Sequence, residues 1–207
     1  MLSNIRNDLM QYEVIKKESL HNGFFRLNRY HIRNELFEGG WSSTFTREVF
    51  ERGYASAILL FDPKLEKLIF VEQFRPGAME SESSPWLMEL VAGMIEVDEQ
   101  PDSVAIRESQ EEAGCEVTRI RKICEYLVSP GGTTERIWLY VGEIDASSLP
   151  DYAGLDDENE DIRIHSVSVA SAFEWLDSGR LNNAMTLIAV QWFKLNWQKN
   201  EDLFDVS

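Results

Sequence analysis

The stretch GMIEVDEQPDSVAIRESQEEAGC, residues Gly93–Cys115, decides the fold of this chain. Its second half is predicted to form a helix. Pro101 and Asp102 suit the first turn of a helix, and Gly114 suits the position just past its end. We therefore expect one helix here, opened by the proline and closed by the glycine.

Three glutamates crowd one face of this predicted helix. Glu108, Glu111 and Glu112 are related by i, i+3 and i, i+4 steps, so they share a face, although like charges at that spacing destabilise a helix. Arg107 borders the face and can hold one carboxylate by paired hydrogen bonds. A cation in front of the face would explain the arrangement, and carboxylate oxygens favour Mg²⁺, Mn²⁺ or Ca²⁺ over zinc. Taken alone, three glutamates also fit an ordinary solvated helix face.

The rest of the chain predicts an α/β fold, a mixed β-sheet sandwiched between helices. Ile106, Ser109 and Ala113 share a second face of the first helix and are expected to pack against that sheet. Strands are expected at Ala55–Phe61, Lys67–Gln73, Trp86–Val91, Ile120–Val128, Ile137–Ile144 and Ile162–Val169, and helices at about Ala170–Ser178 and Asn183–Trp197.

The first fifty residues predict a separate, small antiparallel β region. Strands are expected at Tyr12–Ile15, Phe24–Phe37 and Trp41–Phe50, with a turn at Gly39-Gly40. Such a region is too small to bury a core alone, so it must pack on the rest of the chain or on a second chain. We divide the chain into an N-terminal region, residues 1–50, and a main domain, residues 51–207.

Charge and cysteine content narrow the possible partners. The formal net charge is -16, which disfavours binding to nucleic acid. An anionic substrate would need divalent cations or local arginines beside such a surface. The two cysteines form no CxxC pattern. No apolar segment is long enough for the core of a signal sequence or for a membrane span. We therefore expect a cytoplasmic protein without membrane contact.

The spacing around the glutamates is more specific than the glutamates themselves. All seven fixed positions of the Nudix box are matched, at Gly93, Glu99, Arg107-Glu108, Glu111-Glu112 and Gly114. At residue frequencies of about 7%, a chance match is on the order of 10⁻⁸ per start position. The sequence therefore resembles the Nudix hydrolase family, with Ser109 and Cys115 where the family usually has aliphatic residues.

Other segments resemble bacterial ADP-ribose pyrophosphatases over nearly the whole chain. These segments are FERG at Phe50–Gly53, ELVAGMIE at Glu89–Glu96, SPGGTTER at Ser129–Arg136 and DENEDIR at Asp157–Arg163. The last of them ends a long aperiodic stretch from Asp145 to Asp161, which on its own also fits an ordinary solvated acidic loop. The resemblance implies a Nudix fold with a homodimeric N-terminal β region.

The resemblance also implies a metal site and a general base. Mg²⁺, or Mn²⁺ in its place, would be held by Glu108 and Glu112 with the backbone carbonyl of Ala92, and Glu160 would join them. Glu111 would ligate or orient, while Arg107 and Glu99 would hold the box together. The base that takes a proton from the attacking water would be Glu158.

Substrate contacts follow from the same resemblance. Arg75 would bind phosphate oxygens, since guanidinium groups suit them. Glu135 would accept hydrogen bonds from the terminal ribose hydroxyls. Phe24 and Arg47 would stack on adenine, and in a homodimer they would serve the partner's site.

The expected function is hydrolysis of the pyrophosphate of ADP-ribose to AMP and ribose 5-phosphate by a metal-activated water. One alternative is a Nudix pyrophosphatase for GDP-mannose or another nucleotide sugar, which would share the metal site. A different alternative is a non-catalytic nucleotide sensor on a Nudix scaffold. Such a sensor would be expected to lose box glutamates, and here all of them are present.

Overall fold

The computed structural model describes residues 10–81, 84–154, 160–197 and 202–204. The chain divides into two compact units. One comprises Met1–Arg52 with Val128–Glu135, and the other comprises Gly53–Leu127 with Arg136–Ser207. No helix within these described residues is long and apolar enough to cross a membrane.

The larger unit contains a mixed sheet, as the sequence predicts. In its described part, the strand order is β10-β11-β5-β4-β9-β8, with β6 beside β5 and β7 beside β4. The pairing of β4 with β9 is parallel and the other pairings are antiparallel. The strands are β4 (Tyr54–Asp62), β5 (Lys67–Phe74), β6 (Trp86–Glu89), β7 (Val91–Met94), β8 (Arg119–Leu127), β9 (Arg136–Glu143), β10 (Tyr152–Ala153) and β11 (Ile162–Ser168), and a short 3₁₀ turn, η1, spans Pro76–Ala78.

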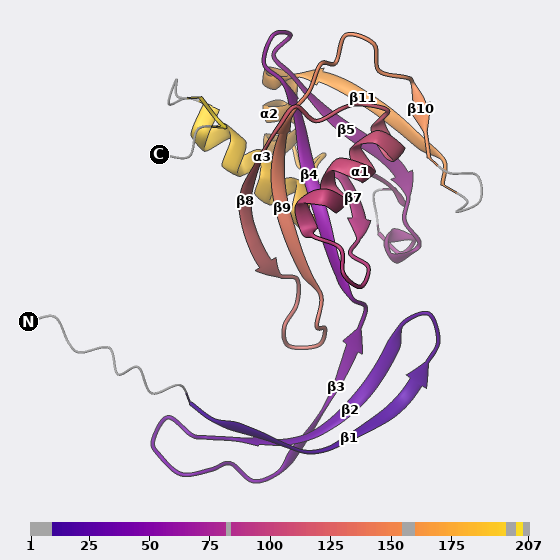
Figure 1. Ribbon diagram of the computed structural model, residues 1–207. Coiled ribbons are helices and arrows are strands. Elements are labelled where there is room, and N and C mark those ends of the chain that lie inside the picture. Colours follow the sequence, from indigo (N-terminus) through magenta and orange to yellow (C-terminus); the bar gives the residue numbers. More distant parts are fainter. Residues whose placement is uncertain (1–9, 82–83, 155–159, 198–201, 205–207) are drawn as a thin grey trace, which may run out of the picture. The chain divides into compact units, whose positions relative to one another are not determined.

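Helices cover both faces of this sheet, which confirms the expected sandwich (Figure 1). They are α1 (Pro101–Ala113), α2 (Val169–Asp177) and α3 (Ala184–Trp197). Alternation along β4 builds two cores, because successive side chains of a strand point to opposite faces. Leu59 and Phe61 pack in the cluster that holds α2 and α3, whereas Ile58 and Leu60 pack in the cluster that holds residues of α1.

Helix α1 begins and ends where the sequence predicts. Pro101 opens it, and Gly114 closes it in the left-handed conformation, with φ at 63° and its N–H donating to the Gln110 carbonyl. The prediction that Ile106, Ser109 and Ala113 all pack against the sheet is partly wrong. Ser109 and Ala113 are buried, but Ile106 is 41% exposed. Ile106 stands about 100° further round the helix than the buried Ala105, and this offset carries it out of the interface.

Two further predictions for this unit need correction. The single strand expected at Trp86–Val91 is two short strands, because β6 pairs with β5 whereas β7 pairs with β4. The buried Leu90 stands between them. In the stretch expected to be aperiodic, the two residues of β10 pair with β11. Both departures arise from pairing with distant strands, which local sequence does not encode.

The smaller unit is a three-stranded antiparallel sheet, in the order β1-β2-β3. Its strands are β1 (Tyr12–Asn22), β2 (Arg26–Asn34) and β3 (Phe45–Glu51). Compared with the prediction, β1 is longer and β2 is shorter, so that Phe24 lies outside the strand. Among the described residues of these strands, only Asn28 is buried. The sheet therefore has little core of its own, as its size suggests.

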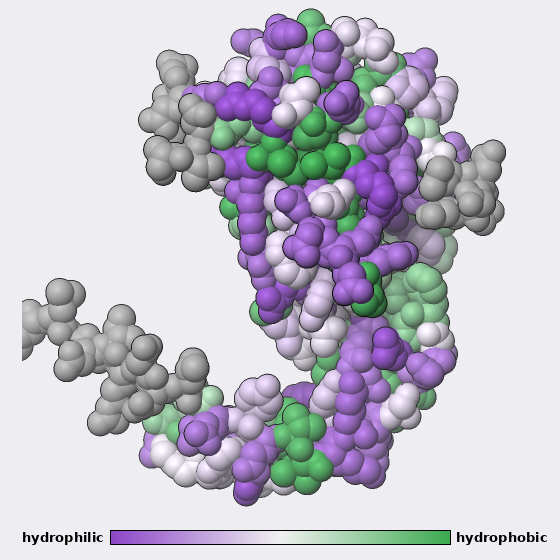
Figure 2. Space-filling view, in the orientation of Figure 1, coloured by the Kyte–Doolittle hydropathy of each residue, from purple (hydrophilic) through white to green (hydrophobic). Residues whose placement is uncertain are grey.

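Apolar side chains remain at the surface of this small sheet. Tyr12, Val14, Ile15 and Leu20 are each at least 41% exposed. On the face visible in Figure 2, hydrophobic residues of this unit lie among hydrophilic ones. The hairpin loop Val128–Glu135 joins the unit through backbone hydrogen bonds to Phe50, at 2.8 Å to the Gly132 carbonyl and 3.1 Å from the Thr134 N–H.

Candidate active site

Helix α1 and strand β7 bring two box glutamates against one short backbone segment. The Ala92 N–H donates to Oε2 of Glu112 at 3.1 Å. At the next position, a Cβ on Gly93 would lie 1.7 Å from Oε1 of Glu108, so any side chain there would displace that carboxylate. The glycine of the box is therefore needed for close approach, and the predicted residues Ala92, Glu108 and Glu112 do lie together.

The carboxyl groups of this cluster are strongly desolvated. Glu112 is 3% exposed, and burial raises its pKa to about 8, against the effect of the Ala92 hydrogen bond. The charges of Glu108 and Glu160 raise that pKa further, whereas the charge of Arg75 lowers it. Burial also raises the pKa of Glu108, with Arg107 opposing it and Glu111 and Glu160 adding to it. The charge of Glu160 therefore reaches both box glutamates, while its predicted role as a metal ligand stays a prediction.

These features fit a hard divalent cation. Buried carboxylates that repel one another are stabilised by a positive ion between them. Within the part of the chain that the structure describes, no group of three or more His, Cys, Asp and Glu side chains is already gathered as a ready-made metal site. One oxygen of Glu112 instead accepts the Ala92 N–H. Among the described residues the carboxyl groups are therefore near one another but not yet arranged as a complete ligand set.

Arg107 joins the loop of the box to its helix, as the resemblance implies. Its guanidinium lies 2.7 Å from Glu111, 3.0 Å from Glu108 and 3.5 Å from Glu99. The other oxygen of Glu99 accepts the Glu96 N–H at 2.9 Å. Glu111, with a side chain 34% exposed, is thus held by Arg107 at the rim of the cluster.

Arg75 lies at the end of β5 and contacts a residue that the sequence analysis missed. Its Nε donates to Oε2 of Glu89 at 2.6 Å, and the side chains are 37% and 6% exposed respectively. The signal in the sequence was a lone charged residue inside the apolar run from Trp86 to Val91. A carboxylate in such a run is rarely buried without a partner.

The acidic loop returns to the sheet close to β10. Gly154 has φ at 106°, and a Cβ there would lie 2.5 Å from the carbonyl oxygen of Glu160. A glycine is therefore required where the backbone of Glu160 passes. The predicted base, Glu158, lies outside the described residues.

The remaining predicted substrate residues belong to the smaller unit. Phe24 is 90% exposed, with its ring edge-on to Phe25 at 4.7 Å. Arg47 lies over the Phe45 ring at 4.8 Å. Glu135 is 8% exposed and 3.4 Å from Arg52. Phe24 thus offers an open aromatic face, while Glu135 is a fixed carboxylate.

The chain is similar in sequence to known proteins over most of its length. The family model described as NUDIX domain matches residues 51–196. The chain is 46% identical over 198 residues to the ADP-ribose pyrophosphatase of Escherichia coli strain K12, covering 95% of this chain and 93% of the relative. The ADP-ribose pyrophosphatase of Haemophilus influenzae is 44% identical, at 89% and 87% coverage. A GDP-mannose pyrophosphatase of Yersinia pestis is 29% identical, at 91% and 94% coverage.

The raised pKa of Glu112 predicts a stability effect in a chelator. A carboxyl whose folded-state pKa exceeds its unfolded value favours folding most at low pH, and this contribution is lost as the pH rises from about 4.5 to about 8. In EDTA at pH 8, Glu112→Gln should therefore raise the melting temperature above that of the wild type. Thermal unfolding at pH 5 and pH 8 measures it, with the exposed Glu96→Gln as the control. If Glu112→Gln melts at a lower temperature than the wild type at pH 8, burial of the charged Glu112 carboxylate does not destabilise the fold.

Proposed function

Because the chain belongs to the Nudix family, we propose that it hydrolyses the pyrophosphate bond of ADP-ribose to AMP and ribose 5-phosphate with Mg²⁺ or Mn²⁺ as cofactor. The observation that carries this proposal is the close approach of the buried Glu112 and the partly buried Glu108 to the backbone at Ala92 and Gly93. These residues lie in a chain that resembles ADP-ribose pyrophosphatases over almost its whole length.

The residues of the cluster divide the chemistry between them. Glu108, Glu112 and Glu160 would hold the cation with the Ala92 carbonyl. When bound, the cation supplies an acidified water and offsets charge on the phosphoryl oxygens. Glu158 would take the proton of the attacking water, a role that rests on its place in the acidic loop sequence.

The substrate would be held by residues on both sides of its pyrophosphate. Arg75 would donate to the phosphates, because its guanidinium is part-exposed and faces the side of the sheet that carries Glu112. Glu135 would accept from the terminal ribose. Phe24 and Arg47 would stack on adenine, and the exposed ring of Phe24 suits that use.

The alternatives have weaker support. A GDP-mannose pyrophosphatase would use the same metal cluster. However, the GDP-mannose pyrophosphatase of Yersinia pestis is 29% identical to this chain, against 46% for the ADP-ribose pyrophosphatase of Escherichia coli. A non-catalytic sensor has no use for two desolvated carboxyl groups, one of which fills the space beside Gly93 that any side chain there would need. The two cysteines of the chain are free thiols, which supports the cytoplasmic setting expected from the sequence.

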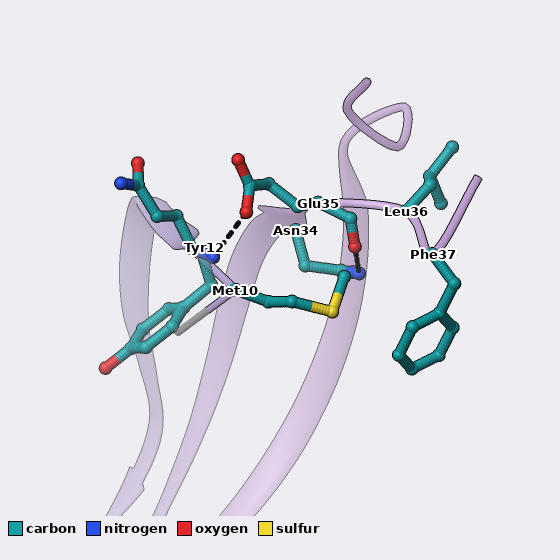
Figure 3. Close-up of a pocket in the computed structure, with 7 residues that line it drawn as sticks. Met10, Tyr12, Asn34, Glu35, Leu36 and Phe37 are labelled. Carbon is teal, nitrogen blue, oxygen red and sulfur yellow. Dashed lines mark hydrogen bonds between the residues drawn. The ribbon is translucent and has the colours of Figure 1, made fainter. Parts of the chain in front are cut away.

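We also propose that the protein acts as a homodimer through its N-terminal unit. Tyr12, the first residue of β1, lines a hollow of about 350 Å³ together with the apolar side chains of Met10, Leu36 and Phe37 (Figure 3). The smaller unit has eight Lys and Arg against eight Asp and Glu, whereas the larger unit has twelve against twenty-eight. A neutral unit can pack on the acidic unit of a second copy without net repulsion.

Product analysis tests the function directly. Purified protein with Mg²⁺ and ADP-ribose should release AMP and ribose 5-phosphate in equal amounts, and faster than it cleaves GDP-mannose. Excess EDTA should abolish the reaction. Glu112→Gln should lower turnover by several orders of magnitude because it removes a charged ligand, while Glu96→Gln should stay near wild type. Full activity in EDTA would refute the metal mechanism.

The assignment of the base is tested by two matched variants. Glu158→Gln should lower kcat far more than it changes KM, because a base acts in the transition state and adds little to ground-state binding. Steady-state kinetics over a range of Mg²⁺ concentrations separates this from Glu160→Gln, which should shift the Mg²⁺ requirement instead. A crippled Glu160→Gln beside a nearly silent Glu158→Gln would mean that the base is the other glutamate.

Complementation tests whether the two copies share sites. One mutant carries Glu112→Gln and a second carries Phe24→Ala with Arg47→Ala, so that each homodimer is inactive. Unfolded and refolded as an equal mixture, random pairing gives about half heterodimers, each with one intact site. About a quarter of wild-type activity should return. Mixed dimers seen by mass spectrometry without recovered activity would show that each chain builds its own site.

A further inference from the structure

An ion pair between Arg75 and Glu89 lies on the α1 side of the larger unit's sheet. Strands β5 and β6 are antiparallel, with Val71 opposite Glu89. Residues directly opposite in a sheet share a face, and Val71 packs in the cluster that holds residues of α1. Arg75 follows β5 in an extended conformation, and its Nε is 2.6 Å from Oε2 of Glu89.

The burial of the two partners is unequal. The Glu89 side chain is 6% exposed, whereas that of Arg75 is 37% exposed. A carboxylate at that depth is strongly unfavourable without its cation, so the pair holds the longer and more exposed side chain in place. The carboxylate is the fixed partner, and the guanidinium is the one that reaches the surface.

The atom used for the bond decides where the rest of the guanidinium points. The hydrogen bond takes the Nε–H. Four N–H groups on Nη1 and Nη2 lie at the other end of the planar group, where they can form a fork around phosphate oxygens. An arginine anchored through Nε therefore presents a fixed pair of donors on the face of the sheet that carries Glu112.

We infer that Glu89 is a positioning residue that fixes Arg75 for the phosphates of a nucleoside diphosphate substrate. The inference rests on the proposed function, because it takes Arg75 as the phosphate contact. With Glu89 in place, the side chain of Arg75 is already ordered in the folded protein. The loss of its conformational entropy therefore does not weaken substrate binding. Since the phosphates are anionic in both substrate and transition state, the effect falls on KM and leaves kcat almost unchanged.

A double-mutant cycle tests this arrangement. Glu89→Gln keeps the size of the side chain and removes its charge, and it should raise the KM for ADP-ribose about tenfold with kcat within about threefold of the wild type. Arg75→Ala should raise KM at least as much. The double mutant should be no worse than Arg75→Ala alone, because Glu89 acts through Arg75. Glu143→Gln, which breaks the ion pair with Arg119 at the β8–β9 edge, is the matched control and should keep the wild-type KM.

Additive effects of the two variants, or a fall in kcat with an unchanged KM, would overturn the inference. Should Glu89→Gln fail to fold, Glu89→Asp takes its place, because it keeps the charge but shortens its reach. A KM rise of about threefold is then expected, and a wild-type KM would overturn the inference.

Calorimetric titration with ADP-ribose in EDTA gives a readout apart from activity. The dissociation constant should rise in Glu89→Gln by a factor similar to KM, and an unchanged value would overturn the inference. If the wild type cleaves a different nucleoside diphosphate sugar, the proposed substrate is wrong, and the same cycle with that compound still decides the role of Glu89.

Discussion

The site depends on the close packing of a charged helix on a short strand. Oε1 of Glu108 occupies the space that a side chain at Gly93 would take, and Glu112 is 3% exposed beside the Ala92 N–H. Ser109 of α1 is fully buried, and its hydroxyl donates to the Ala105 carbonyl at 2.7 Å, so this polar group is satisfied within the helix.

This packing destabilises the folded state, because it buries carboxyl groups that are charged at high pH. Two carboxyl groups of α1 have raised pKa values because burial and neighbouring carboxylates disfavour their charge. The folded chain therefore carries strain that a divalent cation would relieve, and binding of the cation would stabilise the fold by mass action. The same packing therefore accounts for the raised pKa values of the carboxyl groups and for the stabilisation expected from a bound cation.

The sequence predicts the parts of the fold that depend on local pattern. The box spacing located α1 and the two glutamates at Gly93, because capping residues and helical spacing act over a few residues. The exposure of Ile106 escaped prediction because the buried face of α1 is centred closer to Ala105 than the predicted stripe. The break at Leu90 also escaped prediction, since it follows from pairing with two different strands that are distant in sequence. Glu89 was missed for the same reason, because its partner Arg75 is visible only once β5 and β6 are paired.

Two arginines near Glu108 and Glu112 form different numbers of ion pairs, and this difference indicates different roles. Arg107 is surrounded by three carboxylates, so its positive charge is already balanced within the box. Arg75 has one ion pair among the described residues, and it uses Nε alone for its hydrogen bond. An anionic substrate approaching an acidic surface needs donors that are not already neutralised. Arg107 therefore stabilises the loop and helix of the box, while the remaining guanidinium N–H groups of Arg75 suit its proposed role as the contact for the pyrophosphate.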